Sequence, residues 1–176
     1  MRKALHKLSI TVACAAILAA PMFVEAADHS KPLPERVRHE LAMLPYYNVF
    51  DDLGFQVDGN TVILLGDVTN PVLKSDAERT VKRVEGVGQV VNKINVLPLS
   101  PFDWQIRRAE YRSIFGYSGM YRYAMGAMPT IHIIVSNGHV KLEGVVDNQG
   151  DKNIAGIRAN SVPGVFSVEN DLKVKS

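Results

Sequence analysis

The sequence has little cysteine and no apolar run long enough for a membrane-spanning helix. Its 176 residues include one cysteine, Cys14, which lies in a leader that we expect to be removed. The mature chain would then have neither a disulfide nor a thiol nucleophile. The apolar run at 8–20 covers about 13 residues, short of the roughly 20 that a membrane-spanning helix needs. Packing alone must therefore stabilise the fold.

The leader, residues 1–26, has the three-part pattern of a secretory signal peptide. Basic residues open it, the apolar run follows, and Val24 and Ala26 are the small residues that precede a cleavage site. We expect cleavage after Ala26 and export. The alternatives are a retained anchor, or a lipoprotein acylated at Cys14, which is disfavoured because Thr11 stands where such a signal carries leucine.

The remainder of the chain has no excess of charge of either sign. The whole sequence has 20 Lys and Arg against 18 Asp and Glu, and without the leader 17 of each remain. Binding of nucleic acid requires a broad basic surface. We therefore expect no nucleic-acid partner, and any preference for anions must come from a local patch.

Residues that could carry catalysis are scarce as well. The histidines after the leader are His29, His39, His132 and His139. His132 is expected on a solvated sheet face opposite Glu143, and with His139 it lacks the third ligand that zinc needs. Asp51 and Asp52 adjoin, so extended backbone would point them apart. A hydrolytic centre needs a nucleophile, a base and an orienting group together. We expect no enzyme, and no metal, cofactor or small-molecule substrate.

What the chain does contain is a sequence unit written twice. At an offset of 78, residues 55–96 align with 133–174 without a gap, and 14 of the 42 pairs are identical. Chance gives roughly three identities at this length. The shared residues are mostly apolar or turn-forming, which indicates duplication of a fold.

Each copy predicts the same order of elements. In the second copy, residues 131–136 and 139–143 alternate around Asn137-Gly138, the strongest short hairpin signal. This turn places Val135 opposite Val140 and His132 opposite Glu143. In the first copy, Asn70-Pro71 begins a helix that Gly86 ends, and a strand follows at 90–96. A further helix precedes each hairpin, at 34–44 and at 103–115, the latter capped by Asp103.

The predicted fold is α+β. It has two tandem αββαβ domains, each a three-stranded mixed sheet with two helices packed on one face. The first copy covers residues 33–97, a linker covers 98–101, and the second copy covers 102–174 with an insertion at 116–129.

Small motifs recur at corresponding places in both copies. They are Gly66 and Gly144 at the hairpin, Gly86-Val87 and Gly164-Val165 after the helix, and Val90-x-Asn92 and Val168-x-Asn170 in the last strand. This pattern resembles the BON domain, named for bacterial OsmY and nodulation proteins. The resemblance implies a non-enzymatic periplasmic protein of the envelope that binds phospholipid or attaches other modules, in some members under osmotic stress. Asn92 and Asn170 point inward in this pattern, so we expect their amides to be hydrogen-bonded as part of the fold.

The helix predicted at 103–115 has two apolar sides. Ile106, Ala109 and Ser113 form one side. Trp104, Tyr111 and Phe115 form the other, flanked by Arg107, Arg108 and Arg112. The insertion adds Tyr117, Met120, Tyr121, Arg122, Tyr123, Met125 and Met128. Aromatic rings edged with arginine suit an anionic membrane surface.

Two interpretations of the aromatic side remain open. It is core or packs against the first copy, or it is a free surface that binds anionic phospholipid or an envelope partner. For a free surface, Trp104, Arg107, Arg108, Tyr111, Arg112, Phe115, Tyr121, Arg122 and Tyr123 are the candidate binding residues. The rival functions are a stress holdase that uses the same Tyr/Met segment, and a structural attachment module of a larger envelope complex.

Overall fold

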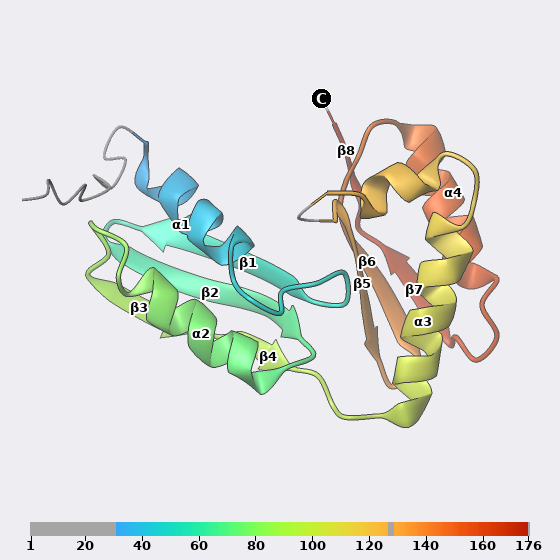
Figure 1. Ribbon diagram of the computed structural model, residues 1–176, viewed down its shortest axis with the longest axis horizontal. Coiled ribbons are helices and arrows are strands. Elements are labelled where there is room, and N and C mark those ends of the chain that lie inside the picture. Colours follow the sequence, from blue (N-terminus) through green and yellow to red (C-terminus); the bar gives the residue numbers. More distant parts are fainter. Residues whose placement is uncertain (1–30, 127–128, 176) are drawn as a thin grey trace, which may run out of the picture. The chain divides into compact units, whose positions relative to one another are not determined.

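The computed structural model describes residues 31–126 and 129–175. The predicted signal peptide with its cleavage site, His29 and Met128 lie outside this range. The first copy consists of α1 (Leu33–Ala42), β1 (Asp52–Asp58), β2 (Thr61–Val68), α2 (Pro71–Val81), β3 (Gln89–Asn92) and β4 (Asn95–Val96) (Figure 1). The second copy consists of α3 (Pro101–Phe115), the 3-10 helix η1 (Met120–Ala124), β5 (Ile131–Ser136), β6 (His139–Val146), α4 (Gln149–Asn160), β7 (Ser167–Asn170) and β8 (Lys173–Val174).

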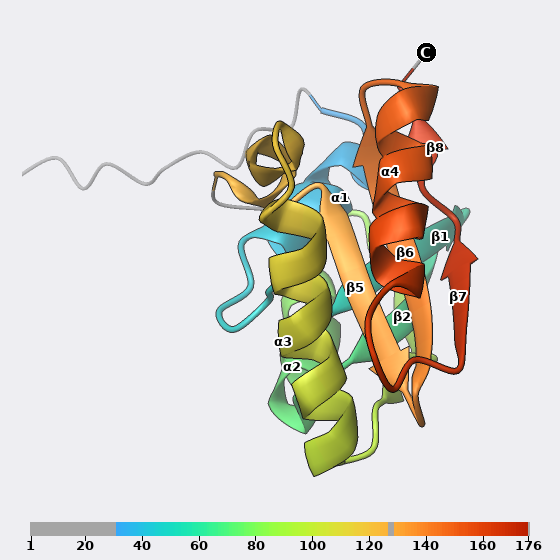
Figure 2. The same ribbon diagram turned by 90° about the vertical axis from the view of Figure 1, so that its right-hand side faces the viewer.

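Both copies contain the predicted mixed sheet. β2 pairs with β1 in antiparallel and with β3 in parallel orientation, and β6 pairs in the same way with β5 and β7. The short strands β4 and β8 also pair in parallel with β2 and β6, so each continues the third strand beyond a two-residue break. Figure 2 shows α3 and α4 side by side on one face of the second sheet. The fold is thus α+β with two repeated domains.

The predicted register of the second hairpin is confirmed. Val135 lies opposite Val140 and His132 opposite Glu143. Asn137 and Gly138 both have positive φ, 52° and 80°, as the two-residue turn requires. Gly144, with φ 119°, lies where a Cβ would collide with the backbone of Thr130. Only glycine fits that place without strain.

The last strand of each copy is fastened to the preceding helix by an asparagine. Asn92 donates to the Lys74 carbonyl at 3.0 Å, and Asn170 donates to the Lys152 carbonyl at 2.8 Å. The side-chain oxygen of Asn92 accepts the N–H of Ile94 at 3.1 Å. These bonds satisfy a partly buried amide within the fold, as a buried polar group requires.

One expected helix cap was wrong. Ser100, and not Asp103, caps α3, because its hydroxyl accepts the Asp103 N–H at 3.1 Å. The Asp103 carboxylate is fully buried and instead accepts the N–H groups of Asn137 and Gly138, at 2.9 and 2.8 Å. It therefore ties the start of α3 to the hairpin turn.

The core of the second copy includes a residue of the first. The side chain of Val49, from the loop between α1 and β1, is buried in the cluster that contains Ile106, Ile133 and Leu142. Its carbonyl accepts the Ile133 N–H at 2.7 Å. An edge strand presents unpaired backbone groups, and here the loop satisfies one of them on β5.

The outer face of the second sheet is more covered than expected. His132, predicted to be solvated, is buried, and its ring stacks on Tyr47 with centroids 5.5 Å apart. Ile134 on the same face is buried too. The burial of His132 follows from packing against Tyr47, which is far earlier in the chain, so periodicity within the hairpin could not show it.

Candidate functional site

The aromatic side of α3 is divided between core and surface. Phe115 is buried, whereas Trp104 and Tyr111 are 47% and 41% exposed. The Tyr111 and Phe115 rings lie 4.9 Å apart. The outward-facing part of the predicted stripe is thus made by Trp104 and Tyr111, with Phe115 as its buried base.

A ring from the first copy covers part of this side. Phe50 meets Trp104 edge to face at 5.6 Å between centroids, and it meets Tyr111 at 6.4 Å. Such contacts stabilise aromatic pairs beyond simple burial. Packing against the first copy and exposure to solvent therefore occur together on the same helix side.

The buried side of α3 differs from the predicted one. Its buried residues are Asp103, Ile106, Arg107, Glu110, Ile114 and Phe115. Ala109 and Ser113, which were expected at the centre of that side, are only half-buried. Ser113 faces α4, where its hydroxyl and carbonyl both bond to Arg158 at 2.9 Å. α3 therefore packs on two elements at once, β5 and α4.

The three candidate arginines of α3 have different environments. Arg107 is buried, and its guanidinium donates to the Val135 carbonyl at 2.6 Å. Burial lowers the pKa of Arg107, and the nearby Asp103 and Asp51 carboxylates oppose this shift. Arg108 and Arg112 are exposed, and neither forms an ion pair with a residue that the structure describes. Only these two can meet a ligand directly.

Both carboxylates of α3 are withdrawn from the surface. Asp103 is held by the hairpin turn, as described above. Glu110 is fully buried, and neither of its carboxylate oxygens has a hydrogen-bond partner. Burial raises the pKa of Glu110 to about 8, so the side chain is mainly neutral at pH 7. Because residues 101–126 contain no other acid, the exposed charges of this segment are all positive.

The segment after α3 is partly structural. Tyr123 is buried, and its hydroxyl donates to Asp151 at 2.6 Å and accepts the Asp147 N–H at 3.0 Å. Arg122 forms ion pairs with the carboxylates of both aspartates. These candidate residues thus fasten η1 to the start of α4. Tyr117, Tyr121 and Met125 are exposed.

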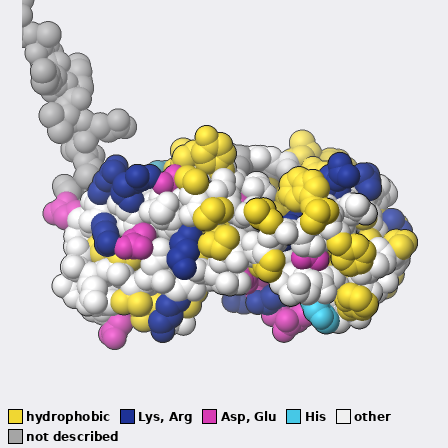
Figure 3. Space-filling view, turned by 90° about the horizontal axis from the view of Figure 1, so that it is seen from below, with side chains coloured by type: hydrophobic (Ala, Val, Ile, Leu, Met, Phe, Trp, Pro, Cys, Tyr) yellow, Lys and Arg dark blue, Asp and Glu magenta, His cyan; other side chains and the backbone are white. Residues whose placement is uncertain are grey.

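Two further phenylalanines of the second copy are exposed and were missed in the sequence. Phe102 is 47% exposed at the start of α3, and Phe166 is 74% exposed in the turn before β7. Both rings lie against glycines, Phe102 near Gly164 and Phe166 near Gly138. Figure 3 shows hydrophobic patches over the half of this face that belongs to the second copy. The repeat alignment could have indicated Phe166. The equivalent residue of the first copy, 78 positions earlier, is Gly88, so the second copy has a large ring where the first has none.

Replacement of Phe50 tests how far the first copy shields the surface. In Phe50→Ala, Trp104 loses its edge-on neighbour, so we expect its emission to shift to longer wavelength and acrylamide quenching to increase. Trp104 is the single tryptophan, so the signal is unambiguous. Phe166→Ala is the matched control, since Phe166 contacts His139 and not Trp104. An unchanged Phe50→Ala spectrum would contradict the contact.

Within residues 31–126 and 129–175, no three or more His, Cys, Asp or Glu side chains are grouped so that they could hold a metal ion. None of the helices in these ranges has both the length and the apolar composition of a membrane span.

Both copies match a known protein family. Residues 35–98 and 124–176 match the model of the BON domain. Osmotically-inducible protein Y of Escherichia coli (strain K12) is 33% identical over 135 residues, which span 70% of this chain and 62% of that protein. The second matched segment begins after most of η1, so the α3 surface lies outside the family match.

Two solved structures of CdsD, a structural protein of the type III secretion system of Chlamydia trachomatis, also align. One is described as the C-terminal domain of CdsD. Their TM-scores are 0.34 and 0.33 at 14% identity, and the alignments cover 82% and 81% of this chain and 98% and 92% of theirs. With the family match over two segments and the 33% identical relative, the chain belongs to the BON domain family and carries two copies of the domain in tandem.

Proposed function

We propose that this protein is a non-enzymatic periplasmic envelope protein whose second BON domain binds anionic phospholipid through α3 and the segment after it. One observation carries the proposal. Between residues 101 and 126 the surface displays aromatic rings and arginines, while both carboxylates of the segment are buried. A bilayer surface that carries negative charge would meet no repulsion from this segment.

The chemistry of the exposed residues fits a lipid headgroup region. Tryptophan and tyrosine rings settle at the boundary between headgroups and acyl chains. Arg108 and Arg112 have no competing carboxylate among the described residues, so their guanidinium groups are available to lipid phosphate. Each such arginine contributes about 1 kcal/mol near an anionic surface.

Export and stress response complete the proposal. The leader pattern at 1–26 favours a periplasmic location. The relative in Escherichia coli is named an osmotically-inducible protein, which supports a role in the response of the envelope to osmotic stress. The alignment spans only 62% of that relative, so the stress role is part of the proposal for this chain.

Vesicle binding by a double variant tests the lipid proposal. The mature parent should co-sediment with phosphatidylglycerol vesicles and not with phosphatidylcholine vesicles, and Trp104 emission should shift to shorter wavelength. In Trp104→Ala, Arg108→Ala we expect the partition coefficient to fall at least about tenfold, because one interfacial ring and one phosphate contact are lost. Added salt should weaken binding by the parent, since the arginines act through screened charge.

The matched control is Tyr46→Ala, Arg83→Ala, which removes an exposed ring and an exposed arginine from the first domain. It should bind vesicles as the parent does. Absence of binding by the parent, or equal loss in the two double variants, overturns the lipid proposal. Suppressed aggregation of an unfolded client without vesicle binding would instead favour the holdase, which would use Tyr117, Tyr121 and Met125.

A further inference from the structure

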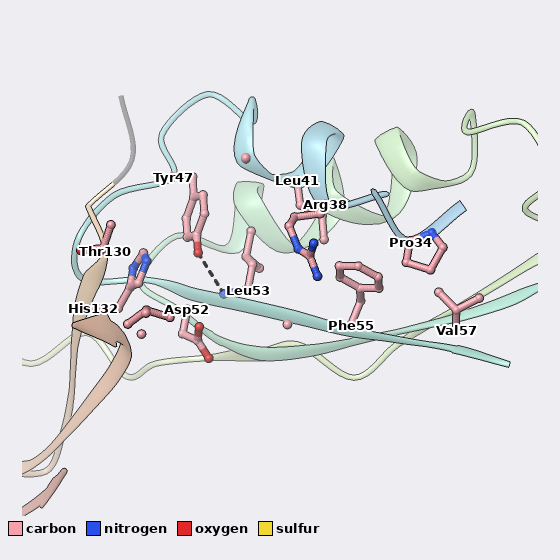
Figure 4. A pocket seen from close by; sticks show the side chains of 14 residues that line it. Pro34, Arg38, Leu41, Tyr47, Asp52, Leu53, Phe55, Val57, Thr130 and His132 are labelled. Atoms are coloured by element: carbon pink, nitrogen blue, oxygen red, sulfur yellow. Dashed lines mark hydrogen bonds between the residues drawn. The ribbon is translucent and has the colours of Figure 1, made fainter. Parts of the chain in front are cut away.

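The first domain has a groove along the outer edge of its sheet. The pocket measures about 710 Å³. α1 lines one wall and β1 the other, and Figure 4 shows Arg38 and Leu41 above Leu53 and Phe55. Most of its surface is apolar. Its far end reaches His132 of the second domain beside Tyr47, where the α1–β1 loop already packs on β5.

Backbone groups of β1 border this groove without partners in the described part of the chain. The hairpin pairs Asp58 with Thr61 across a two-residue turn. In the alternating antiparallel pattern, Phe55 and Val57 then direct their N–H and C=O groups away from β2. The Leu53 N–H, which points the same way, donates to the Tyr47 hydroxyl at 3.3 Å. No described residue bonds to the corresponding groups of Phe55 or Val57.

The equivalent strand edge in the second domain, that of β5, is occupied by another segment of the chain. Ile133 corresponds to Phe55 at the repeat offset of 78, and its N–H donates to the Val49 carbonyl at 2.7 Å. Val135 corresponds to Val57, and its carbonyl accepts from Arg107. The Val49 side chain is buried next to the bond it makes. A main-chain segment with an apolar side chain therefore occupies the edge of β5, while the same edge of β1 has no such occupant among the described residues.

We propose that the β1 edge binds an extended peptide segment of a partner protein by strand addition. Main-chain bonds to Phe55 and Val57 would provide affinity, and alternate apolar side chains of the peptide would enter the groove. Arg38 is exposed at the groove and forms no ion pair with a described residue. Asp52 also lines the groove, at the end where His132 lies. The groove therefore favours a peptide whose carboxylate lies beside Arg38 and away from that end.

The unpaired backbone groups favour peptide over lipid at this place. An acyl chain fills an apolar groove but offers neither N–H nor C=O to a strand edge. The site lies on α1 and β1, so it is separate from the α3 surface, and failure of one proposal leaves the other intact.

A designed peptide and its N-methylated form test strand addition on the mature chain. The probe is a fluorescein-labelled peptide of about nine residues with valine at alternate positions, threonine between them and one aspartate. Fluorescence anisotropy should show saturable binding. N-methylation of the backbone at the pairing positions should weaken it at least about tenfold, the effect of losing two hydrogen bonds. Amide exchange at Phe55 and Val57 should slow when the peptide binds.

The charge preference has its own variants. Arg38→Glu should weaken binding of the aspartate peptide and leave an asparagine version of the peptide unaffected. Arg83→Glu, at an exposed site away from the groove, should bind as the parent does. Equal affinity for the N-methylated peptide, unchanged exchange at Phe55 and Val57, or absence of binding by the parent overturns the proposal. Equal effects of the two arginine variants would overturn the role of Arg38.

Discussion

Glu110→Gln should stabilise the protein at pH 8 and change its stability little at pH 4.5. The parent buries a carboxyl group without a partner, and burial raises its pKa from 4.5 to about 8. Glutamine at this position would also be polar and buried, but its amide does not ionise, so it adds no pH-dependent cost to folding. The gain at pH 8 should be several kcal/mol, since each unit of pKa shift corresponds to about 1.36 kcal/mol.

The direction of the pH dependence follows from the raised pKa. Below pH 4.5, Glu110 is protonated in both the folded and the unfolded protein, so it costs nothing through ionisation. Between pH 4.5 and about 8, the unfolded chain releases the proton while the folded one keeps it. The free energy of unfolding therefore falls as pH rises, and the loss is complete above about pH 8.

Urea unfolding at pH 4.5, 6 and 8 measures this difference between parent and variant. Glu35→Gln is the control, because Glu35 is exposed in the first turn of α1 and should show the parent's pH profile. If the stability of Glu110→Gln changed with pH as steeply as the parent's, Glu110 would not be the buried acid responsible for the pH dependence.

Asp103→Ala should cost about 2–6 kcal/mol, because each of two N–H groups that lose their acceptor costs about 1–3 kcal/mol. The substitution leaves the N–H groups of Asn137 and Gly138 without acceptors at the hairpin turn. Amide exchange at these two residues should accelerate, and the urea midpoint should fall. Asp103→Asn retains one acceptor oxygen, so its loss should be intermediate.

Ser100→Ala separates the role of the cap from that of the hairpin tie. Because Ser100 caps α3, its removal should cost about 1 kcal/mol and leave exchange at Asn137 and Gly138 unchanged. If Ser100→Ala were more damaging than Asp103→Ala, the buried carboxylate would not be the main link between α3 and the turn.

The hairpins and their register were predictable because their signals are local. Alternation around Asn137-Gly138 determines both the turn and the facing pairs. Because the unit is duplicated, each signal occurs twice: Gly66 corresponds to Gly144, and Asn92 corresponds to Asn170. The helix that begins at Pro71 was predictable for the same reason.

The role of Asp103 could not be read in this way. Ser100 and Asp103 are both common caps near a helix start, and the sequence offers no means to choose between them. The contact that decides, with the turn 34 residues later, depends on how α3 lies on the sheet.

The candidate surface was only partly predictable for a related reason. A helical wheel places arginine and glutamate outside, yet Arg107 and Glu110 are buried. β5 and the loop that carries Val49 and Phe50 cover this part of α3. That loop lies more than 50 residues earlier in the chain, so no pattern within 101–115 contains the information.

The burial of Val49 in the second copy has a consequence for loss of the first copy during evolution. A gene that lost its first half would encode a remaining half with a hole where this valine belongs and an uncapped strand ready to aggregate. We therefore expect the second copy to be less stable alone than in tandem, because Val49 supplies part of its core and covers part of its edge strand.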